Sequence, residues 1–232
     1  MTITNDSAER IREKKKLFLA REQRIIEATL QLLLEQSIDR VSVSKIAAKA
    51  GIGKGTVYKH FLTKSDILFR LVIDYEKHIT QSLARGIEQA EEGDSGAAAK
   101  AYFNARLESP ERDRLMQNLE TRLIESGQLA DEIEELHKLR RSNEDDLSEL
   151  MTKLIDRGVL EDVPPHYHYL ACLALAQGAV ELCFNKSWNY RTDNTQLMEF
   201  ITNIGITMGN RGQYRNLNTQ SPESWVWPQK RA

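Results

Sequence analysis

The sequence predicts an all-α protein. Only 5 prolines and 12 glycines interrupt its 232 residues, which favours long helices over many short strands. Apolar residues recur at helical spacing through most of the chain, and no stretch shows the strict alternation of a half-buried strand. A composition of 41% hydrophobic and 28% charged residues provides enough apolar material for a sizeable core.

The N-terminal part is expected to form four helices. The first, at residues 18–35, carries an apolar stripe typical of a helix with one buried face. Two short helices at residues 43–50 and 54–60 follow, and Thr63 then caps a second long helix, with Asp66 placed to complete a capping box. Beyond residue 96, helices are expected at residues 97–107, 110–125, 129–157, 165–188 and 195–208.

The two short helices are predicted to form a helix-turn-helix. Ser42 is placed to cap the first of them, and the small side chains of Ala47 and Ala50 allow the second to cross closely. Gly51 stands where the first helix must end in a left-handed conformation, which glycine adopts without strain. Two short helices joined by a short glycine turn are typical of this motif.

The outward face of the second short helix carries residue types that suit DNA. Lysine donates to guanine, the threonine methyl packs on a thymine methyl, and tyrosine and histidine reach phosphate oxygens. Helix N-termini at the two flanking helices add exposed N–H groups for phosphate. The predicted DNA-binding set is Ser42, Ser44, Lys45, Lys54, Gly55, Thr56, Tyr58, Lys59, His60 and Lys64.

Residues 20–70 resemble the DNA-binding domain of the TetR family of bacterial repressors. Ile52 replaces the usual valine and Leu62 stands where proline is frequent; neither change is expected to disturb DNA contact. The residues that match the family pattern in register are Ser42, Ile46, Ala47, Ala50, Gly51, Gly55, Thr56, Tyr58, His60, Phe61, Lys64, Ile67 and Leu68.

This resemblance implies a homodimer whose first three helices bind double-stranded DNA and whose remaining helices bind a small-molecule effector and the partner subunit. It further implies a palindromic operator with recognition helices about 34 Å apart, and release of DNA when the effector binds. By the same resemblance Ser42, Tyr58, His60 and Lys64 would hold phosphates. Lys54, Gly55, Thr56 and Lys59 would face bases. Activation in place of repression is left open, because the sign of regulation depends on where the operator lies.

The distribution of charge agrees with contact to a polyanion at one end. Residues 1–65 hold 13 Lys and Arg against 7 Asp and Glu, whereas the net charge of the whole chain is −2. Because acidic residues are interleaved with it, the basic stretch at residues 10–16 is interpreted as a solvated extension of the first helix. An arm that contacts phosphates or the minor groove is the alternative.

The second half is expected to supply the dimer interface and the effector pocket. The segments at residues 165–188 and 195–208 are apolar enough to be buried on more than one side, which fits a four-helix dimer interface; core helices of a monomer are the alternative. The sequence indicates the effector pocket less clearly, and each candidate pocket residue could instead be an ordinary core residue. The candidate pocket residues are Tyr102, Phe103, Met116, Leu119, Leu123, Leu147 and Phe184.

The expected organisation is an arm at residues 1–16, a helix-turn-helix DNA-binding domain at 17–64, an effector-binding and dimerisation domain at 65–209 and a tail at 210–232. No signal peptide or apolar membrane span is apparent, so a cytoplasmic location is expected. We find no metal-ligand spacing, phosphate loop or nucleophile elbow, and expect neither catalysis nor a metal or cofactor. A helical adaptor whose helix-turn-helix no longer binds DNA is the competing hypothesis.

Overall fold

A computed structural model describes the chain except for residues 1–2, 186, 188–192 and 212–232. The all-α prediction is confirmed: the described part is helical, with an isolated bridge between Leu160 and Asn210 as its only β pairing. The expected tail lies almost entirely outside the described residues. The helices are α1 (Ile3–Glu35), α2 (Val43–Lys49), α3 (Lys54–His60), α4 (Lys64–Glu91), α5 (Ala97–Leu107), α6 (Pro110–Ser126), α7 (Ala130–Asp156), α8 (Pro165–Phe184) and α9 (Asn194–Thr207).

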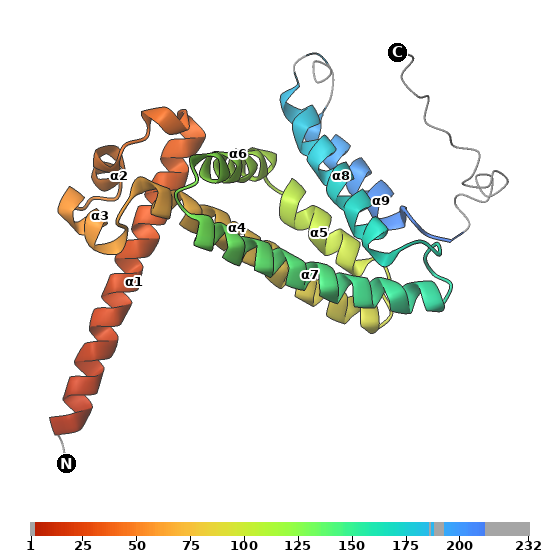
Figure 1. The fold of residues 1–232 in the computed structure, drawn as a ribbon, viewed down its shortest axis with the longest axis horizontal. Coiled ribbons are helices and arrows are strands. Elements are labelled where there is room, and N and C mark those ends of the chain that lie inside the picture. The colour runs from red at the N-terminus through yellow and green to blue at the C-terminus, as the bar shows by residue number, and fades with distance from the viewer. Residues whose placement is uncertain (1–2, 186, 188–192, 212–232) are drawn as a thin grey trace.

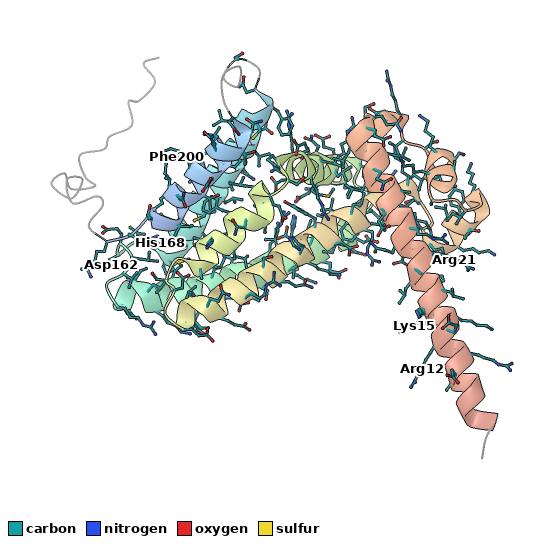
Figure 2. All side chains as sticks on the ribbon, turned by 180° about the vertical axis from the view of Figure 1, so that it is seen from behind. Arg12, Lys15, Arg21, Asp162, His168 and Phe200 are labelled. Carbon is teal, nitrogen blue, oxygen red and sulfur yellow. The ribbon has the colours of Figure 1, made fainter. Side chains whose placement is uncertain are left out.

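Helices α1, α2 and α3 form a small N-terminal domain at one end of the molecule (Figure 1). Helix α1 begins at Ile3, well before the expected start at residue 18, because its first half contains no glycine or proline and is rich in strong helix formers. Its N-terminal half projects beyond α2 and α3, and Arg12, Lys15 and Arg21 lie along this projecting part (Figure 2). The division of the chain at residues 16 and 64 stays a prediction.

The body is built around α4, which contacts α5, α6 and α7 (Figure 1). The capping box at the start of α4 is present: the Thr63 side chain accepts from the backbone N–H of Asp66, whose carboxylate accepts from the N–H of Thr63. Helices α8 and α9 pack on α5 at the far end of the molecule. Among the described residues, no helix combines the length and apolar character that crossing a membrane requires.

Polar contacts join the body to the N-terminal domain. The Arg122 guanidinium on α6 donates to the Asp39 carboxylate, at 2.6 Å for its shorter bond. Arg70 on α4 is within 2.5 Å of the Glu22 carboxylate on α1. Helices α4 and α6 thus touch the small domain directly, which matters for any signal that passes between the two parts.

Candidate functional site

The helix-turn-helix has the geometry that its sequence predicts. The Ser42 hydroxyl accepts from the backbone N–H of Lys45 at 3.3 Å and caps α2. Gly51 ends that helix with a φ of +67°, in the left-handed region that favours glycine. Ile46 of α2 and Val57 of α3 are both fully buried between the helices. The packing of these apolar residues turns the opposite face of α3 outward.

The outward face of α3 presents the lysines and the tyrosine that the sequence singled out. Lys54, Gly55, Tyr58 and Lys59 are exposed, and Thr56 is half-buried. The Lys54 Nζ lies 5.9 Å from the centroid of the Tyr58 ring, so the two side chains occupy one patch. A Cβ at Gly55 would meet no neighbouring atom, so this part of α3 is open to close approach by a partner. Ser42 and Ser44 lie nearby, at the start of α2.

His60 is not on this exposed face. Its side chain is only 3% exposed, and its ring lies 4.0 Å from the ring of Phe18, centroid to centroid. Its Nδ1 atom is buried without a hydrogen bond, 3.9 Å from the Glu22 carboxylate. The structure therefore gives His60 a packing position between α1 and α3, out of reach of a phosphate in this conformation.

Two of the predicted lysines bind the protein's own backbone. The Lys64 ammonium donates to the Ile38 carbonyl at 2.6 Å, and partial burial lowers the pKa of Lys64. The Lys45 ammonium donates to the Arg40 carbonyl at 2.8 Å. These contacts hold the segment before α2 in place, which is a structural use of both side chains.

A cavity of about 330 Å³ lies within the body, between α4, α5, α6, α7 and α8. Charged and aromatic side chains line much of it, where a plain core would have apolar residues. The charged ones are Glu76, Arg106, Asp113, Glu120 and Arg140, and the aromatic ones are Tyr75, Tyr102 and Tyr169.

Asp113, at the start of α6, is the centre of one polar cluster in the cavity wall. It is 0% exposed and accepts from the Nε and Nη2 atoms of Arg106, at 2.9 and 3.0 Å. The Tyr75 hydroxyl donates to it at 2.7 Å and Gln117 at 2.6 Å. Arg106 also donates to the Tyr102 hydroxyl at 2.8 Å. Both charges of this pair are therefore compensated, as buried charges require.

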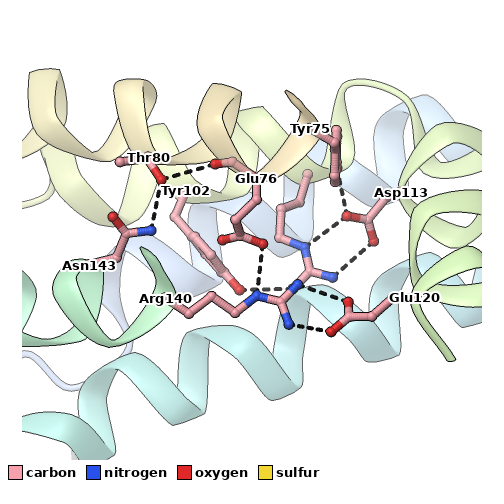
Figure 3. Close-up of polar contacts among 9 residues, drawn as sticks. Tyr75, Glu76, Thr80, Tyr102, Asp113, Glu120, Arg140 and Asn143 are labelled. Carbon is pink, nitrogen blue, oxygen red and sulfur yellow. Dashed lines mark hydrogen bonds and ion pairs between the residues drawn. The ribbon is translucent and has the colours of Figure 1, made fainter. Parts of the chain in front are cut away.

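Arg140, on α7, is the centre of the second cluster. Its Nη atoms donate to the two Glu120 oxygens at 2.6 and 2.9 Å, and its Nε donates to one Glu76 oxygen at 2.8 Å. Figure 3 shows the two carboxylates on either side of this guanidinium. Nearby, the Asn143 amide donates to the Thr80 hydroxyl at 2.9 Å. These bonds tie α7 to α4 and α6.

Of the seven pocket residues expected from sequence, only Tyr102 and Met116 line this cavity. Phe103 and Leu119 are fully buried in the core, and Leu147 is nearly so. Leu123 and Phe184 line separate surface hollows. Sequence reasoning missed the charged lining, because these residues come from separate helices and each resembles an ordinary surface residue when the chain is examined segment by segment.

The outer faces of α8 and α9 expose large apolar side chains. Phe200 on α9 is 62% exposed and points outward (Figure 2). The neighbouring Ile204 and, on α8, Tyr167, Leu170 and Leu182 are also exposed. This is the surface on which the sequence predicted a dimer interface, and apolar side chains gathered on one surface are typical of sites that bind another protein.

Sequence comparison identifies the N-terminal domain. Residues 25–71 match the family model described as bacterial regulatory proteins, tetR family. An HTH-type transcriptional regulator of Staphylococcus aureus (strain bovine RF122 / ET3-1) is 42% identical over 60 residues, which cover 25% of this chain and 32% of the relative. The match thus spans about a third of that relative's length.

Comparison of structures extends the likeness to most of the chain. A bacterial regulatory protein in the tetR family from Rhodococcus RHA1 aligns with a TM-score of 0.63 and 14% identity, over 82% of this chain and 96% of that one. The TetR family transcriptional regulator PfmR from Thermus thermophilus aligns with a TM-score of 0.62 and 18% identity, over 79% and 97%. AibR, solved in complex with isovaleryl coenzyme A and operator DNA, aligns with a TM-score of 0.60 and 13% identity, over 81% and 98%. At these identities the likeness establishes the fold.

Proposed function

Because residues 25–71 match the TetR family model and the fold resembles that of TetR-family regulators, we propose that the chain is a transcriptional repressor of this family that binds a palindromic DNA operator as a homodimer and is released by a small-molecule effector. The observation that carries this proposal is the exposed patch of Lys54, Gly55, Tyr58 and Lys59 on a helix held by a helix-turn-helix. Its open, basic face suits insertion into the major groove.

DNA contact is assigned to the outward-facing residues of α3 and to the start of α2. Lys54, Thr56 and Lys59 face the bases, with Gly55 allowing close approach, and Ser42 and Tyr58 hold phosphates. His60 is left out of this set, because its ring is covered by Phe18.

The homodimer is proposed to form through α8 and α9. Their exposed apolar side chains, Phe200 above all, would be buried in a four-helix interface. A Phe200→Glu variant is expected to run as a monomer in sedimentation velocity while the unchanged protein runs as a dimer. Dimeric Phe200→Glu protein would place the interface elsewhere.

The effector is proposed to act through α6. This helix carries part of the cavity wall, through Met116, Gln117 and Glu120, and the Arg122 side chain that contacts Asp39 in the N-terminal domain. A ligand that moves α6 would therefore shift the recognition helices of the two subunits relative to each other. By linkage, ligand and operator must then weaken each other's binding by the same factor.

The decisive experiment is selection of the purified protein against random double-stranded DNA, followed by sequencing of the bound pool. Enrichment of a palindrome with half-sites about one helical turn apart is the expected result. No enrichment at low salt with ligand-free, refolded protein would reject the regulator in favour of a helical adaptor.

Variants then locate the contact on α3. Each of Lys54→Ala and Lys59→Ala is expected to relax preference at particular bases of the operator, whereas Tyr58→Ala, which removes a phosphate contact, is expected to weaken binding to all sequences alike. Lys77→Ala, which removes an exposed lysine from α4 in the body, is the matched control and should leave both measures unchanged.

A further inference from the structure

We infer that the cavity between α4, α5, α6, α7 and α8 takes a small organic cation, held by the free oxygen of Glu76 and by the surrounding tyrosine rings. This inference rests on the proposed function in one respect only, that the ligand of this cavity is the effector. The charge balance of the cavity wall, one unpaired carboxylate oxygen and the aromatic lining all support it.

The Arg106–Asp113 pair contributes no net charge to the cavity wall. Arg106 and Asp113 form a pair in which both charges have partners: Asp113 accepts four hydrogen bonds, and Arg106 donates to both its oxygens and to Tyr102. This pair offers neither a free positive charge nor a free negative charge to a ligand.

The cluster of Arg140, Glu76 and Glu120 carries a net negative charge. A single guanidinium, that of Arg140, serves two carboxylates, those of Glu76 and Glu120. Both Glu120 oxygens are bonded to it, whereas Glu76 uses only one of its two oxygens. With the neutral pair added, the wall carries one excess negative charge, and no other Lys or Arg lines the cavity among the described residues.

The second Glu76 oxygen is the acceptor of this cluster that the protein leaves open. No hydrogen bond reaches it within the described part of the chain, although the residue is only 7% exposed (Figure 3). This oxygen stays accessible from the cavity, so a donor that enters gains a charge-assisted hydrogen bond with it there. An ammonium or amidinium group supplies both the donor and the missing positive charge.

The rest of the lining suits a cation that carries apolar or aromatic groups. The rings of Tyr102 and Tyr169 meet edge to face at 5.8 Å between centroids, and the Tyr75 ring forms another part of the wall. Burial raises the pKa of Tyr102 and that of Tyr169, so both phenols stay neutral at ordinary pH. Neutral tyrosine rings attract cations through their faces, as Arg106 already does with its guanidinium carbon 5.6 Å from the Tyr102 centroid.

The same wall disfavours other ligand classes. An anion, including one bearing phosphates, would find both guanidinium groups already paired and would face the excess carboxylate. A neutral ligand of the same shape would leave the excess negative charge of the wall uncompensated. The volume of about 330 Å³ lies at the small end of ligand pockets and favours a compact molecule.

Calorimetric titration of the full chain with matched probes tests the inference. Benzyltrimethylammonium, phenethylammonium and benzamidinium are the cationic probes, neopentylbenzene is the uncharged counterpart of the first, and benzenesulfonate is the anionic one. Binding of at least one cation, with no binding of the other two probes, is expected. Preference for benzenesulfonate or neopentylbenzene, or no binding by any cation, overturns the inference without any variant.

Two variants assign the binding to Glu76. Glu76→Gln keeps the shape of the side chain and removes its charge, and should weaken binding of the cation by about tenfold or more. Glu149→Gln removes an exposed carboxylate from α7 and should bind the cation as tightly as the unchanged protein. Circular dichroism melting confirms that both variants are folded. Equal affinity in Glu76→Gln and the unchanged protein would overturn the assignment.

The operator selected from random DNA separates this inference from the proposed function. Cation binding that depends on Glu76 and also releases the operator supports both. Cation binding that depends on Glu76 but leaves operator affinity unchanged supports the site and rejects the release mechanism. Operator binding by a protein that binds no cation supports the regulator and rejects the cation site.

Discussion

Neutralising Asp113 tests whether the cavity wall is held by a buried ion pair. The Asp113 carboxylate is 0% exposed and accepts bonds from Arg106, Tyr75 and Gln117. An Asp113→Asn substitution keeps the shape of the side chain but turns one acceptor into an N–H group that faces other donors. The Arg106 guanidinium, which is only 7% exposed, then has no counter-charge beside it.

Removing one partner of a buried, hydrogen-bonded ion pair costs about 3–5 kcal/mol, because the other charge stays buried and unpaired. For a protein of this size that cost corresponds to a fall in Tm of about 6–20 °C. The free-energy cost and the fall in Tm both refer to unfolding of the whole body, since Asp113 joins α6 to α4 and α5.

Urea unfolding followed by circular dichroism measures this cost. The matched control is Asp74→Asn, because Asp74 also pairs with an arginine but is partly exposed, and its partner Arg70 keeps a second carboxylate in Glu22. The double variant Arg106→Met/Asp113→Leu removes both charges and should recover much of the stability that the single variant lacks. A destabilisation below about 1 kcal/mol in Asp113→Asn, or no recovery in the double variant, would refute the reasoning.

Three further predictions concern other parts of the fold. Thr63→Ala removes the capping box of α4 and should lower stability by about 1 kcal/mol, or Tm by about 2–4 °C, in the same unfolding assay. Gly205→Ala places a Cβ directly against the Phe103 ring, which is 0% exposed, and should cost about 1–3 kcal/mol; an unchanged midpoint would mean that α9 packs more loosely on α5. Burial holds the pKa of Tyr75 well above its usual value, so the folded state keeps a proton that the unfolded state loses above about pH 10. This contribution to stability is therefore complete below about pH 10 and disappears as the pH rises further, and the urea midpoint of Tyr75→Phe should fall less steeply between about pH 9 and pH 11.

Local sequence patterns were sufficient for the fold class and for the helix-turn-helix. The cap at Ser42, the left-handed turn at Gly51 and the buried positions Ile46 and Val57 depend on residues close together in the chain. For the same reason the exposed set on α3 follows from the spacing of the residues within a single helix. The start of α1 was placed too late, because charge-rich residues 3–17 lack an apolar stripe even though they are good helix formers.

Contacts between distant segments decided what these local patterns left open. His60 looks like an exposed phosphate contact in sequence, but Phe18, far earlier in the chain, covers its ring. The cavity is the larger case, because Glu76, Asp113 and Arg140 lie on three helices and each has the appearance of a solvated surface charge. The sequence by itself determined an all-α chain with an N-terminal helix-turn-helix. Only the packing of α4, α6 and α7 brought these charges together in the interior, since pairing between distant residues leaves no periodic signal along the chain.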